Sequence, residues 1–352
     1  MTNKKPKIFV AMSGGVDSSV VAFLLKKEGH EVEGVTMKTF CYRDSSGQKS
    51  CCGIEAIIKA QKMCEKLGIP HHILDVSKKF KKEVMDKFIK EYEAGRTPNP
   101  CVRCNGLIKF GELLDFALKN GAEFLATGHY AVIKTTKNIT KLFRGADPKK
   151  DQSYFLNELA QKQLLHILFP LGEMTKDEVK KIAKKNKLPI MESESQEVCF
   201  IDTDLKKFLS SRVKYKPGDI FLTNGKKIGT HTGLPFYTIG QRAGIGGKGP
   251  YYVVKLDTKK NRLIVSNNPK DKSLLSKKLT IKKFNWISGT KPKLPLKTSV
   301  QIRYHDTPGT ATIYNKGGIY EIKFIRPKRA VTPGQSAVIY KGKECLGGGI
   351  IA

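Results

Sequence analysis

Acidic residues, long apolar segments and tryptophan are all scarce in this sequence. The 352-residue chain has one tryptophan, and its 32 Asp and Glu face 64 Lys and Arg, so its formal net charge is +32. Apolar runs such as residues 20–25 fall far below the roughly 18 residues of a membrane-spanning helix, and the N-terminal apolar run is too short for a signal peptide. We therefore expect a cytoplasmic protein without a membrane partner.

The excess of basic residues indicates a polyanionic partner. A net charge of +32 with a pI near 9.8 is typical of proteins that bind nucleic acid. The alternative is a compositional bias that places lysines on solvated helix faces, as in residues 78–90. We favour nucleic acid, because excess positive charge attracts phosphate backbones whatever its origin.

The first part of the chain alternates apolar runs with helical patterns. This order is typical of a doubly wound α/β domain with a parallel sheet. The expected strands are residues 8–12, 32–37, 72–76 and 124–127. The expected helices are residues 18–27, 54–67, 79–92 and 107–119, and later 153–160 and 176–186.

Glycine and proline become frequent after this domain, and short β-branched runs replace the helical patterns. Residues 219–270 predict a small β-rich module in which YYVVKLD and RLIVSN pair across the turn at residues 258–261. From Leu279 onward, short strand-like segments are spaced for a small barrel. The expected domains are a catalytic α/β domain (1–205), a central β-rich domain (206–275) and a C-terminal β-barrel domain (276–352).

The first expected strand leads directly into the loop SGGVDSS, residues 13–19, and then into a helix. This arrangement points backbone N–H groups and the positive end of the helix dipole at one spot, which makes an anion site. The loop lacks the GK[ST] lysine of a Walker A motif, and it is not GxGxxG. Asp17 is placed to help hold the metal ion that accompanies phosphates. The alternative is a serine-capped helix after a glycine turn.

The loop resembles the pyrophosphate loop of the N-type ATP pyrophosphatases, which adenylate a carbonyl-type oxygen and release pyrophosphate. The resemblance implies an adenine nucleotide hydrolase-like domain that uses ATP with Mg²⁺. Since open α/β sheets bind ligands at the carboxyl ends of their strands, Met37 and Gly128 would line the adenosine pocket. The implied ATP-binding residues are Ala11, Met12, Ser13, Gly14, Gly15, Val16, Asp17, Ser18, Met37 and Gly128.

Two cysteines, Cys101 and Cys104, lie in the polar stretch NPCVRCN, which we expect to be a loop before a helix at Leu107. A third, Cys199, lies far along the chain. A zinc site needs a second ligand pair, and the later half offers only isolated histidines. A thioredoxin-like pair needs CxxC at a helix start, without the PNP turn. We favour cysteines that act as reagents.

The other cysteines carry weaker signals. A reducing compartment disfavours structural disulfides among the eight cysteines of the chain. Cys41, Cys51 and Cys52 follow the second strand near the expected ATP site, and we favour an ordering role over metal binding or sulfur transfer. Cys64 is expected in the core and Cys345 in a C-terminal strand.

Further motifs extend the resemblance over essentially all 352 residues. GRTPNPxxxCN, IKF, ATGHY, KDQSYFL, LFPLGE, CFI, GQR, TPGQSAV and CLGGGII occur in the order seen in the MnmA/TrmU family of tRNA-specific 2-thiouridylases. The resemblance implies ATP-dependent 2-thiolation of the wobble uridine in tRNAs for Lys, Glu and Gln. The uridine would pass through an adenylate, with release of pyrophosphate and AMP.

The same resemblance gives the cysteines their roles. Cys199 would carry persulfide sulfur, and Cys104 would attack the persulfide or close a disulfide with Cys199. Many family members have aspartate in place of Cys101, and a neutral thiol is a poor substitute for that base. The three thiols would instead suit a [4Fe-4S] cluster with one open iron that holds sulfide. Both mechanisms stay open, with a cysteine desulfurase relay or sulfide as the sulfur donor.

The expected tRNA contacts begin in the turn that holds the first cysteines. Asn99, Pro100 and Cys101 would contact the target uridine, which must flip out of its stack. The further implied tRNA-binding residues are His129, Lys150, Asp151, Gln152, Arg303, Tyr304 and Gln335. The alternative roles are a packed structural histidine for His129, a helix cap for Asp151, and ordinary strand surface for the last three residues of this list.

Two other functions compete with tRNA thiolation. A pyrophosphate-loop ligase or amidase acting on a small metabolite would leave the β-rich domains and the basic charge unexplained. A non-enzymatic iron-sulfur or RNA-binding protein would leave the intact SGGVDS loop unexplained. Release of pyrophosphate that is stimulated by tRNA would separate the three.

Overall fold

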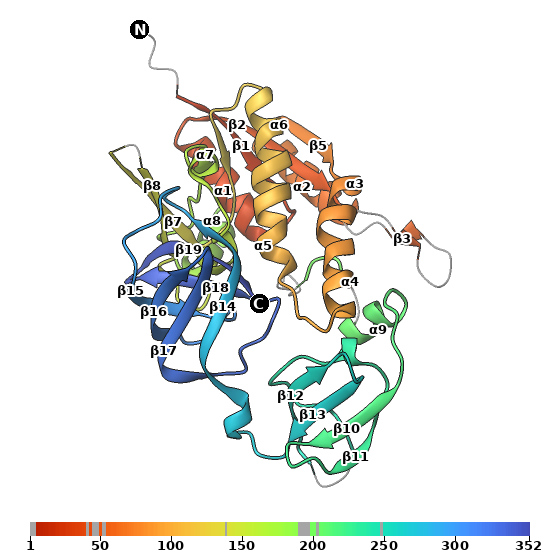
Figure 1. Ribbon diagram of the computed structural model, residues 1–352. Coiled ribbons are helices and arrows are strands. Elements are labelled where there is room, and N and C mark those ends of the chain that lie inside the picture. The colour runs from red at the N-terminus through yellow and green to blue at the C-terminus, as the bar shows by residue number, and fades with distance from the viewer. Residues whose placement is uncertain are drawn as a thin grey trace.

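The computed structural model describes residues 5–39, 42–43, 49–50, 54–137, 139–188, 198–201, 204–246 and 249–352. Figure 1 shows a layered α/β body at the N-terminal end of the chain, a small β-rich unit and a barrel that contains the C-terminus. The predicted fold class is confirmed by this arrangement and by the sheet topology.

The first body is built on a five-stranded parallel sheet with the order β5-β2-β1-β6-β9. Strand β1 is central because Ile8 pairs with Val32 on one side and with Phe124 on the other. The middle residues of β1 are fully buried, as expected for a strand covered on both faces. The strands are β1 (Lys7–Ala11), β2 (Glu31–Lys38), β5 (His71–Asp75), β6 (Phe124–Ala126) and β9 (Ile167–Leu168).

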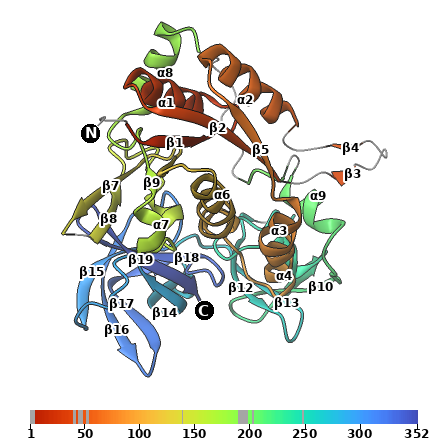
Figure 2. The same ribbon diagram turned by 90° about the horizontal axis from the view of Figure 1, so that it is seen from above.

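Helices cover both faces of this sheet. Ile8 and Val10 pack toward one helix layer, and Phe9 packs toward the other, as the alternation of strand side chains requires. Figure 2 shows α1, α2 and α8 on one side and α3, α4 and α6 on the other. The first layer is α1 (Val16–Lys27), α2 (Ile54–Leu67) and α8 (Lys176–Lys185). The second is α3 (Ser77–Phe80) and α4 (Asp86–Glu93), joined by π turns at Lys81–Met85, and α5 (Pro100–Cys104) and α6 (Leu114–Lys119), joined by π turns at Asn105–Leu113.

The expected loop around the first cysteines is wrong, because a helix begins there at Pro100. The Asn99 side-chain oxygen accepts hydrogen bonds from the N–H groups of Cys101 and Val102, at 3.2 and 3.4 Å. An asparagine cap followed by proline at the first helical position is a helix-start signal that the sequence already carried. Cys101 and Cys104 therefore lie in α5, as its second and last residues.

The central unit is a four-stranded sheet with the order β11-β10-β13-β12. The predicted pairing across residues 258–261 is confirmed, since Val253 lies opposite Val265 in an antiparallel register. Its small core is centred on Ile220, Val253 and Leu263. The strands are β10 (Gly218–Leu222), β11 (Lys227–His231), β12 (Tyr252–Asp257) and β13 (Arg262–Ser266).

The C-terminal strands close into the predicted barrel, because β14 pairs with both β17 and β19. A hairpin from the first body extends the same sheet, with Leu142 opposite Cys345. The barrel strands are β14 (Leu275–Trp286), β15 (Leu296–Gln301), β16 (Gly309–Lys316), β17 (Ile319–Arg329), β18 (Ser336–Lys341) and β19 (Glu344–Ile351), and the hairpin is β7 (Ala131–Thr136) and β8 (Ile139–Arg144).

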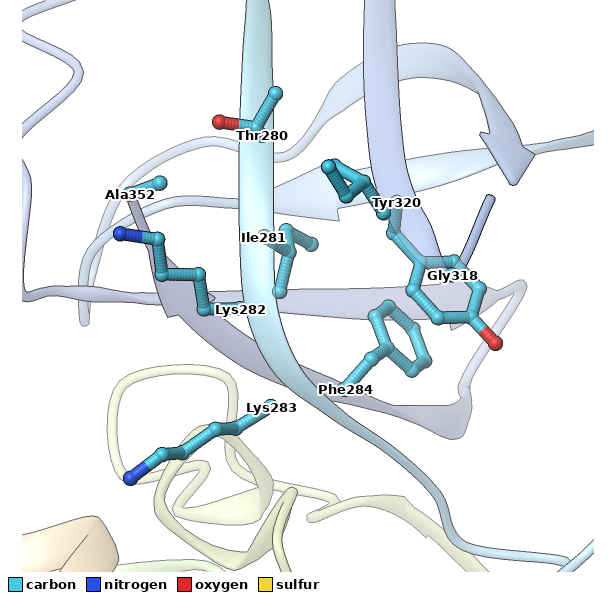
Figure 3. Close-up of a pocket in the computed structure, with 9 residues that line it drawn as sticks. Thr280, Ile281, Lys282, Lys283, Phe284, Gly318, Tyr320 and Ala352 are labelled. Atoms are coloured by element: carbon cyan, nitrogen blue, oxygen red, sulfur yellow. The ribbon is translucent and has the colours of Figure 1, made fainter. Parts of the chain in front are cut away.

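A bulge in β14 joins the barrel to the first body. Lys283 has a φ of 51°, and the register with β19 shifts between Lys282 and Asn285. The Asn285 side chain donates to the carbonyl oxygens of Asn157 and Leu159, both at 3.0 Å. Figure 3 shows the shallow pocket on the barrel side of this bulge, where the rings of Phe284 and Tyr320 stack at 4.4 Å.

Short elements complete the described chain. They are β3 (Tyr42–Arg43), β4 (Lys49–Ser50), α7 (Gln161–Leu164), α9 (Leu205–Ser210) and the 3₁₀ turns Ser153–Leu156, Leu234–Phe236 and Lys272–Leu274. The predicted helix at 153–160 is thus a single 3₁₀ turn. Within the described ranges, no helix is long and apolar enough to cross a membrane.

Candidate functional site

The loop between β1 and α1 is folded by its own hydroxyl groups. The side chains of Ser18 and Ser19 each donate to the Gly15 carbonyl at 3.0 Å, and the Ser13 N–H donates to the Ser18 hydroxyl at 3.2 Å. Gly15 is the N-cap and supplies no side-chain hydrogen bond, so no side chain caps the helix start. Uncapped N–H groups at the start of a 12-residue helix form a suitable site for phosphate oxygens.

The other predicted ATP residues surround this loop. Gly14 has a φ of +74°, and a Cβ there would lie 2.8 Å from the Ala56 carbonyl, so only glycine fits without a shift. Gly128 follows β6, and a Cβ there would lie 2.9 Å from the Cβ of Asp17. Met37 is partly buried and packs against two apolar clusters, the one that contains Phe9 and the one that contains Phe200. Ala11 is half-buried, while Met12 and Val16 belong to the core.

Asp17 is the acidic member of the loop, and a lysine and a tyrosine hold its carboxylate. The Lys176 ammonium lies 2.6 and 2.7 Å from the two carboxylate oxygens, and the Tyr130 hydroxyl donates at 2.8 Å. Burial, and then the charge of Asp17, raise the pKa of Tyr130, so this hydroxyl remains a donor. A carboxylate beside a phosphate site fits Mg²⁺, which takes one or two carboxylates together with phosphate oxygens.

The structure brings the three predicted cysteines together. Phe200 is fully buried against Phe80 and Phe88, and its neighbour Cys199 lies close enough for its charge to act on Cys104 of α5. Cys104 belongs to the same apolar cluster as Phe200 and is only 8% exposed. Cys199 is exposed, and Cys101 is half-buried.

The Cys104 thiol lies in an environment that disfavours its ionised form. Its pKa is raised to about 12, mainly by burial; Lys109 opposes the rise, and the charges of Cys199 and Cys101 contribute to it. A resting Cys104 is therefore protonated at neutral pH. Lys109 is a residue that the sequence analysis passed over, although its position five residues after Cys104 places it on the same continuous helix.

The [4Fe-4S] cluster, one of the two mechanisms left open by the sequence, gains no support from these residues. Across the described ranges, which include all three cysteines, no group of three or more His, Cys, Asp or Glu side chains is placed to hold a metal ion. Cys41, Cys51 and Cys52 lie outside the described residues.

The barrel and the central unit both hold the turn that precedes Asn99. The Gln335 amide donates to the Thr97 carbonyl at 2.9 Å, and the Thr97 N–H donates to the Pro333 carbonyl at 2.9 Å. The hydroxyl groups of Thr97 and Thr238 lie 3.0 Å apart. The turn that positions the cysteine helix is thus clamped by segments far along the chain.

Three of the other predicted tRNA contacts are fixed by internal bonds. His129 is 8% exposed, bonds to the Thr127 hydroxyl at 2.6 Å, and its burial holds its pKa well below the usual value. Asp151 is buried and accepts from Arg144 at 2.7 Å. Gln152 accepts from the Tyr130 N–H at 3.0 Å, which links it to the residue that bonds Asp17. Lys150 is half-buried beside them.

The barrel supplies the remaining two predicted contacts. The Arg303 guanidinium donates to the Ile239 carbonyl at 2.6 Å, and burial lowers its pKa. Tyr304 packs on Phe155 with ring centroids 4.4 Å apart. Arg303 thus joins the barrel to the central unit, and Tyr304 joins it to the first body.

Lys176 and Tyr130 were not among the residues predicted for this site. Tyr130 closes the ATGHY motif, two residues after Gly128, and Lys176 follows the LFPLGE motif as the first residue of α8. Both motifs contribute to the family resemblance, which gives neither residue a role. A lysine at the first position of a helix is unfavourable, since its charge opposes the helix dipole. This position is the local feature of the sequence that could have singled out Lys176.

The fold and this site together define a nucleotide-binding HUP-type domain with paired cysteines and two appended β units. Residues 6–203 match the family described as tRNA methyl transferase HUP domain, 206–267 match the tRNA methyl transferase PRC-barrel domain, and 276–351 match the aminomethyltransferase beta-barrel domain.

Curated relatives match over nearly the whole chain. The tRNA-specific 2-thiouridylase MnmA 1 of Syntrophus aciditrophicus is 44% identical, over 99% of this chain and 93% of its own length. The MnmA 2 proteins of Geobacillus kaustophilus and of Thermoanaerobacter sp. are 42% and 44% identical, over 99% and 98% of this chain and 96% and 97% of their own lengths. The chain belongs to the MnmA family of tRNA-specific 2-thiouridylases, as the sequence motifs predicted.

Proposed function

We propose that this protein converts the wobble uridine of the tRNAs for Lys, Glu and Gln to 2-thiouridine through an adenylated intermediate. The observation that carries the proposal is the pairing of an exposed Cys199 with a buried Cys104 in the domain that holds the pyrophosphate loop. A small-metabolite ligase has no use for two such thiols.

The first step activates an oxygen. Uridine O2 attacks the α-phosphorus of ATP, and the bond to pyrophosphate breaks. The uncapped N–H groups of the loop and of α1 would stabilise the phosphate charge. Mg²⁺ held at Asp17 would neutralise charge on the departing pyrophosphate. The ATP residues proposed for this step are those of the loop with Met37 and Gly128.

The second step delivers sulfur. The terminal sulfur of a Cys199 persulfide attacks C2, and AMP leaves with the former O2. The Cys104 sulfur then attacks the Cys199 sulfur, and the Cys104 proton passes to the released base, so a Cys104–Cys199 disulfide forms and the thiocarbonyl is freed. An external thiol reductant restores both cysteines. A cysteine desulfurase relay or a soluble persulfide would reload Cys199, so the donor is supplied from outside the chain.

We further propose that tRNA is held across all three domains, 1–205, 206–275 and 276–352. Asn99, Pro100 and Cys101 would contact the flipped uridine, and the cradle around the clamped turn would hold the anticodon arm. Its proposed members are His129, Lys150, Asp151, Gln152, Arg303, Tyr304 and Gln335. The internal bonds of several of these residues suit a preformed surface, which loses little entropy on binding.

The test is a thiolation assay on unmodified tRNA with ATP, iron-free enzyme and a persulfide donor. We expect 2-thiouridine from the wild type and none from Cys104→Ala or Cys199→Ala, while both variants keep ATP binding. Cys101→Asp, which restores the carboxylate of many relatives, should retain turnover. Thiolation that requires iron would overturn the persulfide route. ATP turnover that tRNA does not stimulate would overturn the assignment of tRNA as the substrate.

A further inference from the structure

The ion pair between Asp17 and Lys176 is the most enclosed charge pair at the nucleotide site. Only 14% of the Lys176 side chain and 32% of the Asp17 side chain are exposed. The ammonium contacts both carboxylate oxygens and also lies 5.7 Å from the centre of the Tyr130 ring. The two residues are 159 positions apart, so the fold brings this lysine to the loop from another helix.

Lys176 is held in place at its backbone as well as at its tip. It is the first residue of α8, whose start is closed by reciprocal bonds between Thr175 and Glu178. Its N–H donates to the Asp147 carboxylate at 3.1 Å. A lysine anchored at both ends has little rotamer freedom left to lose when it binds a ligand.

The loop itself supplies no cation for the phosphates. Residues 13–19 contain glycine, serine, valine and aspartate, with no lysine or arginine. A Walker A loop places a lysine within its own motif to meet the β and γ phosphates. In the present loop that charge has to come from outside the motif, and Lys176 already lies against its aspartate.

We propose that Lys176 is the pyrophosphate-binding cation of this enzyme and that it is paired with Asp17 until ATP binds. When ATP with Mg²⁺ binds, Asp17 passes from the ammonium to its predicted role at the metal, and Lys176 turns to the β and γ phosphate oxygens. The inference rests on the proposed function, because it assigns a role within the same ATP site. It makes Lys176 a substrate-binding residue rather than a structural one.

The exchange conserves charge pairing at the site. Before binding, the carboxylate and the ammonium neutralise each other, which limits the cost of burying either one. After binding, each faces an opposite charge on the ligand. Tyr130 keeps its bond to Asp17 during the exchange, and its backbone is bonded to Gln152, a proposed tRNA contact.

Calorimetric titration with three ligands tests the assignment. Wild type, Lys176→Met, Lys176→Arg and Lys180→Met are each titrated with ATP, pyrophosphate and AMP in the presence of Mg²⁺. Lys180 is an exposed lysine of the same helix and serves as the matched control. A thermal melt of each variant verifies that it is folded.

We expect Lys176→Met to weaken ATP and pyrophosphate binding by about 10- to 100-fold, the effect of losing a charge-assisted contact. AMP lacks the β and γ phosphates, so its affinity should change by no more than about twofold. Lys176→Arg should restore most of the affinity, and Lys180→Met should bind all three ligands like the wild type.

Two results would overturn the assignment. Unchanged pyrophosphate affinity in Lys176→Met would show that the lysine does not meet the phosphates. An equal loss for AMP and ATP would show that it only supports the shape of the loop. If the wild type itself binds neither ATP nor pyrophosphate, the proposed function fails, which is distinct from either result.

Discussion

Cys104 and Cys199 lie near the same apolar cluster but differ in their access to solvent. Cys104 is buried with a pKa of about 12, whereas Cys199 is exposed. Because the thiolate is the reactive form, the raised pKa makes Cys104 far less reactive at pH 8 than an ordinary thiol. This difference suits a carrier thiol that receives sulfur from outside and a partner thiol that stays protected until it is needed.

The order of alkylation follows from this difference. We expect iodoacetamide at pH 8 to modify Cys199 well before Cys104, as read by peptide mass spectrometry over time. The Cys104 rate should rise about tenfold for each pH unit up to about pH 11, since its raised pKa leaves it protonated below that range. Cys199→Ala removes the competing site and provides the control. Equal rates for both thiols at pH 8 would contradict the burial of Cys104.

At the scale of elements, the cap of α5 controls where the cysteines point. Asn99 accepts two N–H groups at the start of a helix of only five residues. We expect Asn99→Ala to lower the free energy of unfolding by about 1 kcal/mol, as measured by urea denaturation. Thiolation should fall too, because the α5 turn loses its fixed start.

Asn99→Ser separates the two roles proposed for this residue. Serine caps a helix about as well as asparagine, so stability should return to within a few tenths of a kcal/mol of the wild type. Thiolation should remain impaired if the amide also contacts uridine. Full recovery of thiolation in Asn99→Ser would show that Asn99 acts only as a helix cap and does not contact uridine.

Local patterns in the sequence predicted the elements well but not their long-range partners. Helix α2 has the predicted bounds, because its apolar spacing and its flanking residues are local signals. The β7–β8 hairpin was not predicted to join the barrel, since its partner Cys345 lies some two hundred residues away. The Gln335–Thr97 bond spans 238 positions, and no periodicity encodes such a contact.

The residues of the candidate site also divide into those that local motifs predict and those that depend on long-range packing. The loop 13–19 could be identified because all its donors lie within one motif, from the first strand to the helix start. The meeting of Cys199 with Cys104 could be inferred only from the family resemblance, since it depends on the packing of Phe200 between helices. Lys176 was missed because its partner is defined by the fold alone.

At the scale of the whole molecule, the three units meet at one turn. Gly334 of the barrel has a φ of +92°, and a Cβ there would lie 2.9 Å from the Thr97 carbonyl. We expect Gly334→Ala to lower thiolation by about 10- to 100-fold, because a shift of about 1 Å in this turn displaces the cysteine helix. ATP affinity should not change, as the nucleotide loop lies on a different segment.

Gly342 provides the matched control for this substitution. It also has a positive φ, of +59°, but a Cβ there would meet nothing within 4 Å. Gly342→Ala should therefore share the backbone strain of about 1 kcal/mol or more without the loss of thiolation. Equal thiolation defects in both variants would mean that strain in the barrel, rather than the clamp on Thr97, is responsible.

The net charge of +32 acts on the molecule as a whole and sets how tRNA binding responds to salt. If the lysines and arginines of the basic surface neutralise about six to ten phosphates, raising the salt from 50 to 200 mM should weaken tRNA binding by about a thousandfold or more. Filter binding of unmodified tRNA over that range measures the slope. Lys180→Met supplies a reference for a single dispersed charge, since one exposed lysine outside the cradle should leave the slope unchanged. A shallow slope would mean that the lysines are dispersed over solvated faces, and recognition would then depend on the few fixed contacts around the Thr97 turn.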